Sequence, residues 1–370
     1  MKKNRKNKHL LYRRKRIFSA FVSAGILAAA LAFGGCGKSS NDVEIALVTD
    51  GAGVDDQSFN QAAWEAVEQY AKETQQKDAY YQPEEVSRKG YAAAIEKALK
   101  AGAEVVICPG EGFETVVYEY QRENLSTKFI LLDGVPHAVD GDVEKLRGNT
   151  HAVLFSKTDE GFLAGYVAVK EGYTNLGYIG SLSESSSAKE YGAGFIKGAD
   201  AAAGELGLTP EQVQLRLTYS ERTNAAPALT DQAAAWYAQG VQVLFSDNTS
   251  IINCIGKAAT AAGTRFISVD QAGSAFSSQR LMNIQANYHT AVYQTLLSLK
   301  EDKYQGGEKE TIGLQIGAVE PSWSSSGLQT FNQDQYTALV SAIQGGTIVM
   351  PENPDGDKLP QVQNLTLSVE

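Results

Sequence analysis

The sequence predicts an α/β protein with two doubly wound lobes, and three observations support this fold class. Short apolar runs alternate with helical stretches from residue 45 onward, which is typical of parallel sheets with right-handed crossovers. Glycines follow the predicted helices, where a left-handed cap residue is favoured. About 330 residues follow the N-terminal 42, which is too many for one simple core and suits two lobes.

Each alternating segment has the pattern of its element. Apolar runs predict buried strands at Ile45–Val48, Val105–Cys108, Phe129–Leu132, Leu176–Ile179, Val213–Leu217, Val241–Phe245 and Phe266–Val269. Helices are expected at Tyr91–Lys100, Thr115–Glu123, Glu160–Glu171, Ala188–Leu206, Ala226–Gln239 and Ile251–Ala262. The glycines just past these helices are Gly102, Gly172, Gly207, Gly240 and Gly263. No internal repeat of fixed period is present, so the prediction of two lobes does not rest on a duplicated sequence.

The turn and helix after the first strand, Asp50–Ala66, form the most informative stretch. Ser58 and Gln61 fit a capping box, which predicts that a helix starts there. In open α/β sheets, ligands lie just outside the carboxyl ends of the strands. The stretch is therefore a candidate pocket; the alternative is that Phe59 packs on the core and that Asp55 and Asp56 only complement the helix dipole.

Aspartates follow four of the predicted strands, at Asp50, Asp133, Asp247 and Asp270. A carboxylate at such an edge can accept charge-assisted hydrogen bonds from the hydroxyl or ring N–H groups of a ligand. One such aspartate is common as a helix cap. Four at one edge indicate a binding site for a small polar ligand.

The N-terminus predicts export and lipidation. Nine Lys or Arg and no acid lie in residues 2–16, and an apolar run follows at Ile17–Phe33. Small residues then precede Cys36, as at a bacterial lipoprotein processing site. We therefore expect a signal peptide over residues 1–35, a lipid on Cys36 and a short tether over residues 36–42. A plain membrane helix is the alternative, although the run is shorter than about 20 residues.

Composition argues against several functions. Without residues 1–35, 24 Lys and Arg face 43 Asp and Glu, which moves the formal net charge from −10 to −19. No basic cluster that could bind nucleic acid is visible in this acidic chain. Cys108 and Cys254 lie in apolar contexts typical of buried thiols. The four histidines have no zinc-site spacing, and we expect neither a metal nor a cofactor.

Several motifs resemble one protein family along the whole chain. The first turn reads V-T-D-x-x-G-x-D-D-x-S-F-N-Q, and D-E-G-F-L-A-G, L-G-Y-I-G, G-A-G-F-I-K-G-A, Q-G-V-Q-V-L-F, I-S-V-D-Q and A-I-Q-G-G-T-I-V-M-P follow in order. These resemble the basic membrane protein family, the purine-nucleoside-receptor-like substrate-binding lipoproteins of ABC transporters. The resemblance implies a type I periplasmic-binding-protein-like fold with a ligand cleft at the hinge, a permease partner and a lipid anchor in the cell membrane on its extracytoplasmic face. Its lobes would be residues 43–150 with roughly 283–310, and 151–282 with roughly 311–370.

The resemblance also implies roles for single residues. Asp50 and Asn60 would contact a purine-like base, Phe59 would stack on it, Asp133 would add a polar contact and Asp270 would accept from ribose hydroxyls. Stacking on an aromatic face suits any nucleobase. Ser58 lies in the same motif and completes this part of the expected site.

The chain departs from the family pattern at three places. A second stacking aromatic is replaced by a polar segment with Arg222, whose guanidinium could stack instead. Asp247 and Asn248 occupy a segment that is Gly-rich in the family. The lysine that helps to hold ribose falls near Ala286. These departures put the identity of the ligand in question.

Two other function classes remain. An enzyme would need a nucleophile and a base, and neither a G-x-S-x-G elbow nor a His-centred triad is present. A sugar-binding or signalling lipoprotein of the same fold is the stronger alternative. A second aromatic in the cleft would favour a base; Tyr191, Phe195 and Trp323 are candidates, although such positions more often lie in the core. The serine-rich segment 183–187 is either a loop facing the cleft or a solvated linker.

Overall fold

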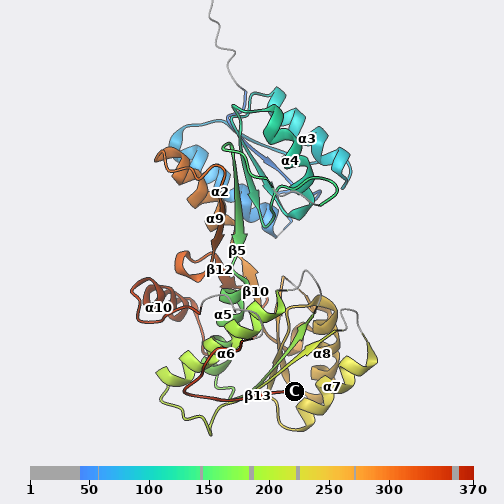
Figure 1. The fold of residues 1–370 in the computed structure, drawn as a ribbon, viewed down its shortest axis with the longest axis vertical. Helices are drawn as coiled ribbons and strands as arrows, with labels where there is room; N and C mark the ends of the chain where they lie inside the picture. The colour runs from blue at the N-terminus through green and yellow to red at the C-terminus, as the bar shows by residue number, and fades with distance from the viewer. Residues whose placement is uncertain are drawn as a thin grey trace, which may run out of the picture. The chain divides into compact units, whose positions relative to one another are not determined.

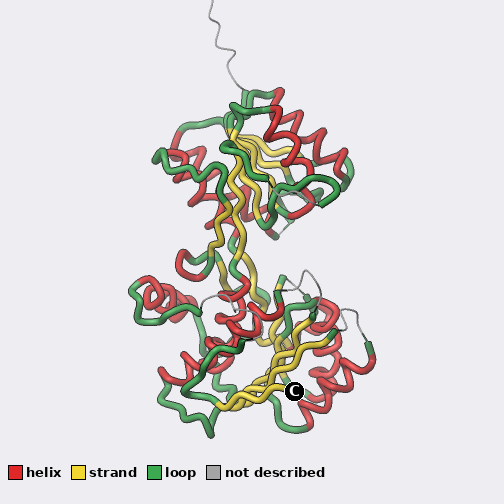
Figure 2. Tube along the Cα trace, in the orientation of Figure 1, coloured by secondary structure: helices red, strands yellow, loops and turns green. Residues whose placement is uncertain are grey.

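A computed structural model describes residues 42–370 except residues 57, 142–144, 183–186, 222–225, 271 and 352–357. Val43–Glu370 forms one compact unit. Within it, strands and helices alternate and build two separate sheets (Figures 1 and 2). We call the part around the six-stranded sheet lobe 1 and the part around the seven-stranded sheet lobe 2.

Lobe 1 is a parallel sheet with helices on both faces. Its strand order is β11-β5-β4-β3-β1-β2, and every pairing in it is parallel. The strands are β1 (Ile45–Val48), β2 (Asp78–Tyr81), β3 (Val105–Pro109), β4 (Lys128–Leu132), β5 (Thr150–Phe155) and β11 (Lys309–Ile312). Its helices are α2 (Phe59–Thr74), α3 (Arg88–Lys100), α4 (Glu114–Glu123) and α9 (Tyr288–Lys300).

Alternation along β1 shows how the core of lobe 1 forms. Ile45 and Leu47 pack in one cluster with residues of α2 and α9, whereas Ala46 and Val48 pack in another with residues of α3 and α4 (Figure 1). Successive side chains of a strand point to opposite faces. A continuous apolar run is therefore what a strand needs when helices cover both faces.

Lobe 2 has the order β12-β10-β9-β8-β6-β7-β13, and among its described pairings only β10 with β12 is antiparallel. The strands are β6 (Asn175–Ser181), β7 (Gln214–Ser220), β8 (Val243–Phe245), β9 (Arg265–Val269), β10 (Arg280–Ala286), β12 (Val319–Pro321) and β13 (Thr366–Val369). The helices are α5 (Lys157–Lys170), α6 (Ala188–Glu205), α7 (Pro227–Ala238), α8 (Thr249–Ala262) and α10 (Gln333–Gln344). Short 3-10 helices in the described chain are η1 (Glu111–Phe113), which follows β3 in lobe 1, η2 (Ser274–Gln279), which precedes β10, and η3 (Leu314–Ile316), which follows β11.

Three segments pass between the lobes. They lead from β5 to α5, from β10 to α9, and from β11 through η3 to β12. Backbone hydrogen bonds join them, from Ser156 N to the Ile312 oxygen (2.9 Å) and from Asn287 N to the Ala318 oxygen (2.8 Å). The Asp159 carboxylate also accepts from Leu314 N at 2.7 Å. The start of α5 is therefore fixed to the third crossing segment.

Glycines bring α5 and α6 into backbone contact. A Cβ atom at Gly165 would lie 2.0 Å from the Phe195 oxygen, and one at Gly198 would lie 1.9 Å from the Phe162 oxygen. Gly161 and Gly194 are equally close to the facing backbone. Only glycine permits this approach, which explains the glycines in two of the motifs quoted above.

The expected fold class is confirmed, since each lobe is built on a mainly parallel sheet covered by helices. Each predicted strand and helix is present with ends shifted by at most a few residues, and the glycines expected after helices have positive φ. Sequence patterns did not identify β2, β5, β10 or the elements after residue 286. The lobe boundaries expected from the sequence, at residue 150 and near residue 283, lie within two of these strands. In the structure, β5 belongs to the first sheet and all of β10 belongs to the second.

Candidate functional site

The Asp50 turn is organised by hydrogen bonds among its own side chains. Asn60 Nδ2 donates to Asp50 Oδ1 (2.7 Å) and to Asp56 Oδ2 (2.9 Å). Asp50 Oδ1 also accepts from Ala52 N at 3.2 Å. Asn60 is fully buried, whereas Asp50 is half-buried. Asn60 thus fixes the orientation of the Asp50 carboxylate.

The expected Ser58–Gln61 capping box is not formed. Ser58 occupies the N-cap position of α2, but its side chain makes no capping hydrogen bond and is exposed. Asp56 Oδ1 accepts instead from Ser58 N (2.9 Å) and Gln61 N (3.2 Å). A carboxylate two residues earlier reaches these N–H groups and also complements the helix dipole.

Three aromatic rings of lobe 1 form a group beside this turn. The ring of Phe59 lies 5.2 Å from that of Tyr288, and the ring of Phe155 lies 4.9 Å from it, measured between centroids. Phe59 is partly exposed, and Tyr288 is 8% exposed. Since Tyr288 begins α9 and Phe155 ends β5, the group lies where two crossing segments leave or enter lobe 1.

Asp133 and Asp270 occupy equivalent positions in the two lobes. Each directly follows a strand, and each has positive φ (54° and 48°), a conformation that aspartate tolerates better than most residues. Asp133 N donates to the Val153 oxygen (2.8 Å) and Asp270 N to the Ile284 oxygen (3.0 Å), so each is fixed to a crossing strand. Among the described residues, no donor is hydrogen-bonded to either carboxylate.

Asp270 is accessible to water, but the surrounding protein influences its charge. Its side chain is solvent-exposed. Desolvation by the surrounding protein nevertheless raises its pKa; attraction to Lys157 opposes this effect and repulsion from Asp133 adds to it.

Lys157 places a positive charge among these carboxylates. Its Nζ donates to Glu160 Oε1 at 3.0 Å, and its side chain is 23% exposed. Burial acts to lower the pKa of Lys157, but attraction to Glu160, Asp133 and Asp270 outweighs it and the pKa is raised. The ammonium is therefore charged and lies within Coulombic reach of an aspartate from each lobe.

Glu160 is the buried partner of Lys157. Burial raises the pKa of Glu160 to about 7, against the attraction of Lys157. Tyr191 donates its hydroxyl to Glu160 Oε2 at 2.5 Å. The pair is thus held by a side chain of α6, and the contact of α5 with α6 fixes its position.

Tyr288 is subject to the charges of acidic residues from both lobes. Burial raises its pKa well above the ordinary value, and Asp133, Asp270, Glu160 and Asp50 each raise it further by repulsion. Its hydroxyl has no hydrogen-bond partner among the described residues. We call Asp133, Lys157, Glu160, Asp270 and Tyr288 the interlobe cluster.

The remaining predicted residues are placed differently. Asp247 Oδ1 accepts from the Tyr178 hydroxyl (2.9 Å) and from Ser181 N (3.1 Å). Asn248 caps α8 by accepting from Ser250 N and Ile251 N. The side-chain oxygens of Asp247 and Asn248 thus make hydrogen bonds within lobe 2. Arg222, Cys36, the leader over residues 1–35 and most of the serine-rich segment 183–187 lie outside the described residues.

Other candidates from the sequence have core positions. Tyr191 and Phe195 belong to the buried core of lobe 2, and Trp323 packs against that core. Ala286, where the family lysine would fall, is the last residue of β10 and packs against the core of lobe 1. Cys108 and Cys254 are buried free thiols, as expected.

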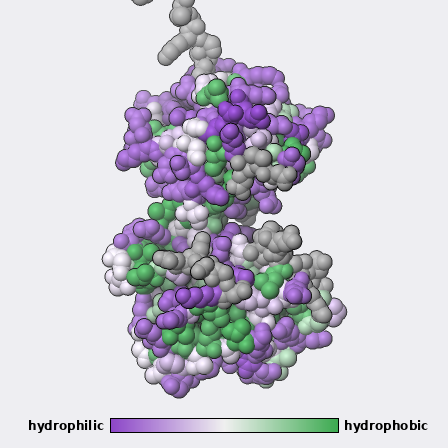
Figure 3. Space-filling model, viewed as in Figure 1, coloured by the Kyte–Doolittle hydropathy of each residue, from purple (hydrophilic) through white to green (hydrophobic). Residues whose placement is uncertain are grey.

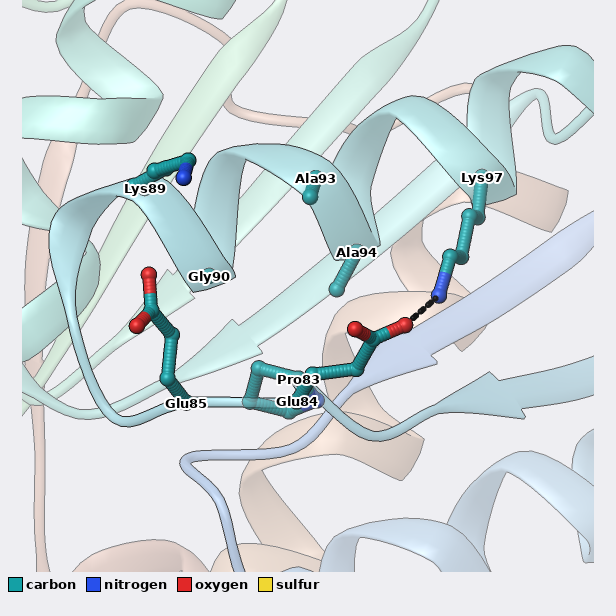
Figure 4. A pocket seen from close by; sticks show the side chains of 8 residues that line it. All are labelled: Pro83, Glu84, Glu85, Lys89, Gly90, Ala93, Ala94 and Lys97. Atoms are coloured by element: carbon teal, nitrogen blue, oxygen red, sulfur yellow. Dashed lines mark hydrogen bonds and ion pairs between the residues drawn. The ribbon is translucent and has the colours of Figure 1, made fainter.

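A separate hollow lies beside α3. It has a volume of about 380 Å³ and is lined by Pro83, Glu84, Glu85, Lys89, Gly90, Ala93, Ala94 and Lys97 (Figure 4). Lys97 reaches Glu84 across it, with 3.0 Å between Nζ and Oε1. The hollow contains none of the predicted site residues and carries no assignment.

Among the described residues, no group of three or more His, Cys, Asp or Glu is arranged to hold a metal ion. None of the described helices is long and apolar enough to cross a membrane. In the view of Figure 3, hydrophilic residues cover most of lobe 1, and a hydrophobic area lies on lobe 2.

Comparison with known proteins identifies the family. Residues 43–353 match the model of the Bmp family, described as ABC transporter substrate-binding protein PnrA-like. The chain belongs to this family. The match spans both lobes and includes every residue of the interlobe cluster.

Curated relatives with similar sequences include members named for this family, and a solved structure shares the fold. The chain is 27% identical to a CD4+ T-cell-stimulating antigen of Listeria innocua and 26% identical to the ABC transporter nucleoside-binding protein BmpA of Lactococcus lactis; in both cases 63% of the chain aligns with 64% of the relative. It is 24% identical to basic membrane protein B of Borreliella afzelii over 91% of the chain and 95% of the relative. An ABC transporter solute-binding protein from Conexibacter woesei shares the fold with a TM-score of 0.59 at 17% identity, over 84% of this chain and 98% of that one.

Sequence reasoning did not identify Lys157, Glu160 or Tyr288 as site residues. Lys157 and Glu160 lie in the first turn of a helix, where charged residues are ordinary. Tyr288 follows β10, which the apolar pattern did not reveal. The Lys-x-x-Glu spacing directly after a crossing strand is the signal that could have found the first two.

Proposed function

We propose that the chain is an extracytoplasmic solute-binding lipoprotein that captures a small polar ligand, a nucleoside or nucleobase, and delivers it to an ABC permease. Membership of the family supports the transport role. The nucleoside-binding name of the Lactococcus lactis relative supports the ligand class.

One observation of the structure carries the proposal. The interlobe cluster holds hydrogen-bonding groups that no described residue satisfies: the carboxylates of Asp133 and Asp270 and the hydroxyl of Tyr288. Asp270 is solvent-exposed and Asp133 is partly exposed, so water solvates these groups until a ligand replaces it. A ligand with hydroxyl or ring N–H groups would satisfy them and would join both lobes.

The aromatic group supplies the apolar side of such a site. The partly exposed Phe59 offers a ring for stacking, and Asp50 beside it offers an acceptor for a base N–H. Asn60 is fully buried, so its contribution to binding is to orient Asp50. Asp270 would accept from ribose hydroxyls on the opposite side.

The experiment compares two single variants in the purified protein. Phe59→Ala should weaken nucleoside binding by about 1 to 3 kcal/mol because the stacking ring is lost. Asp270→Ala should weaken it by about 1.5 to 3 kcal/mol because hydroxyl donors lose a charged acceptor. Calorimetry with melting points near the wild-type value measures both. Unchanged affinity in both variants would show that the pocket is placed wrongly.

The membrane anchor is a separate part of the proposal. The basic leader, the apolar run and the small residues before Cys36 support a diacylated Cys36 that holds the protein on the outer face of the cytoplasmic membrane. Cys36→Ala should abolish labelling with radioactive palmitate and leave the precursor unprocessed. Undiminished label in that variant would refute the anchor.

Binding without turnover completes the proposal. Excess nucleoside incubated with the protein should be recovered intact. Release of free base and ribose at a rate proportional to protein concentration would show an enzyme instead.

A sugar or another non-nucleoside ligand is the second candidate. Phe59 packs against Tyr288, which covers part of the ring that a base would use. Ala286 stands where the family lysine would contact ribose. A thermal-shift screen of nucleosides, nucleobases and sugars separates the candidates, since a ligand of the folded state raises the melting temperature.

A further inference from the structure

We propose that Glu114 and His137 are positioning residues for the ligand contact at Asp133: while its imidazole is protonated, the pair ties the loop that starts at Asp133 to the start of α4, so ligand affinity falls as pH rises. The inference rests on the proposed function, because Asp133 is one of its ligand contacts. It adds two residues that the motifs did not predict, and it makes the site sensitive to pH.

The Glu114 carboxylate meets the loop with both of its oxygens. Glu114 is the first residue of α4, and the loop, residues 133–141, begins where β4 ends. Glu114 Oε1 accepts from Val135 N at 2.8 Å. Glu114 Oε2 lies 3.1 Å from His137 Nε2. One side chain of α4 thus contacts two residues that closely follow Asp133.

The backbone at Asp133 is held from two sides. Upstream, Asp133 N donates to the Val153 oxygen of β5 at 2.8 Å. Downstream, Gly134 is buried, and a Cβ atom placed there would lie 3.0 Å from Glu114 Cγ and 3.1 Å from Glu114 Oε1. Asp133 itself has a φ of 54°, a conformation that persists only when the surrounding contacts maintain it. The direction of its carboxylate therefore depends on Glu114.

The surroundings of the His137 ring favour its protonated form. Nδ1 lies 2.7 Å from the Ala138 oxygen, and Nε2 faces the Glu114 carboxylate. Both neighbours are hydrogen-bond acceptors. A neutral imidazole has one N–H group, whereas the imidazolium has two. Only the protonated ring can donate to both acceptors.

Loss of the proton therefore loosens the loop. The side chains of His137 and Glu114 are 28% and 23% exposed, so solvent can exchange protons with the pair. In the neutral ring one nitrogen lone pair would face an acceptor, whichever nitrogen keeps its proton. Histidine is the side chain whose ordinary pKa, about 6.5, lies near neutrality. The other described titratable groups at the start of α4 and in or beside the loop are Glu111, Asp133, Asp140 and Lys145.

The test measures adenosine binding by calorimetry from about pH 5.5 to about pH 8.5, on both sides of the ordinary histidine pKa. His137→Gln keeps a donor near the position of Nε2 and does not titrate. Glu114→Gln keeps an acceptor for Val135 N and offers Nε2 an amide donor, which suits the neutral ring. Glu119→Gln is the matched control, because Glu119 lies on the same helix and pairs with Arg88 at the surface.

The variants should differ in the sign of their pH dependence. Other titrating groups are common to all four proteins, so each affinity is divided by that of His137→Gln at the same pH. This ratio should fall by about 3- to 10-fold with rising pH in the wild type and in Glu119→Gln, because a charge-assisted hydrogen bond is lost. In Glu114→Gln it should rise instead, because the amide bonds the neutral imidazole.

A pair that only stabilised the fold would change the melting temperature without giving opposite slopes. Melting curves at each pH therefore restrict the comparison to folded protein. A wild-type ratio that does not change with pH would overturn the inference and leave the proposed function intact. If one of the two variants does not fold, the profile of the other against that of Glu119→Gln decides.

Failure of the proposed function gives a different pattern. If the wild-type protein binds neither adenosine nor guanosine, the same series is titrated with ribose and arabinose. The opposed pH profiles with a sugar would support the inference while refuting the nucleoside. Absence of binding to all four compounds would overturn both.

Discussion

The two lobes hold the acidic side chains of the site in different ways. In lobe 1, Asp50 accepts hydrogen bonds from Asn60 and from a backbone N–H within its own turn. In lobe 2, Asp270 has no described donor, and its main electrostatic partner is the charge of Lys157. Lobe 1 is organised locally before any ligand arrives, whereas lobe 2 depends on charges brought together by packing.

The difference follows from the elements that carry the residues. The Asp50 turn and the start of α2 are neighbours in sequence, so short-range bonds suffice. Lys157 and Glu160 belong to α5, and their geometry depends on the backbone contact with α6. Damage to helix packing should therefore reach the lobe 2 side of the site and spare the lobe 1 side.

The largest effect is expected from Gly198→Ala. Its Cβ atom would meet the Phe162 oxygen at 1.9 Å, so the helices must separate. Overpacking of this kind costs about 3 kcal/mol, and a clash with backbone stands at the upper end. Urea denaturation measures the loss.

Gly204→Ala is the matched control on α6. The atoms nearest to its Cβ would be those of the Asn364 side chain, with the nitrogen at 2.8 Å, and a side chain shifts more readily than backbone. The helical preference of alanine offsets much of the cost, by about 1 kcal/mol. Equal destabilisation by the two variants would contradict the idea that α5 and α6 depend on backbone contact.

Asn60→Ala should produce the next largest effect, on the lobe 1 side. It removes a fully buried amide and takes a donor from both Asp50 and Asp56. Loss of hydrogen bonds to charged groups predicts about 2 to 3 kcal/mol of destabilisation. Chemical denaturation and calorimetry should show lower stability together with weaker ligand binding. Full ligand affinity in this variant would show that the orientation of Asp50 is unimportant.

The pH dependence of folding stability should reveal the buried carboxyl group of Glu160, on the lobe 2 side of the site. The pKa of Glu160 is raised to about 7 in the folded state, above its ordinary range near about 4.3. Between these values the folded state binds more protons than the unfolded state, so this group's contribution to stability falls as pH rises toward 7. The advantage of wild type over Glu160→Gln should thus be greater at pH 5 than at pH 7.5, by about 2 kcal/mol.

The measurement is a set of urea unfolding curves across that range. Burial also raises the pKa values of Asp159 and Asp270, which contribute with the same sign in both proteins. The raised pKa of Lys157 acts only above its ordinary value, outside this window. Parallel pH profiles for wild type and variant would show that Glu160 is not the group responsible.

The sequence predicts the buried strands inside each lobe better than the strands that lead from one lobe to the other. Buried strands such as β3 and β4 are continuous apolar runs because helices cover both faces. β5 and β10 mix polar and apolar residues because they extend from one environment to another, and their strand character comes from pairing with distant neighbours. The same reason limits the site: Asp133 and Asp270 were predicted from strand ends, whereas Lys157 interacts electrostatically with them only in the folded protein.

The smallest expected effect on stability distinguishes Asp56 from Ser58 as the residue that caps α2. Asp56→Ala should cost about 1 kcal/mol, because the Asp56 carboxylate caps α2 through Ser58 N and Gln61 N. Ser58→Ala should cost less than about 0.5 kcal/mol, because that exposed hydroxyl makes no capping bond although it occupies the N-cap position. Thermal unfolding of both variants decides the assignment. If Ser58→Ala proves the more destabilising of the two, the capping box expected from the sequence forms in solution, and the lobe 1 side is less settled before binding than the Asp56 contacts indicate.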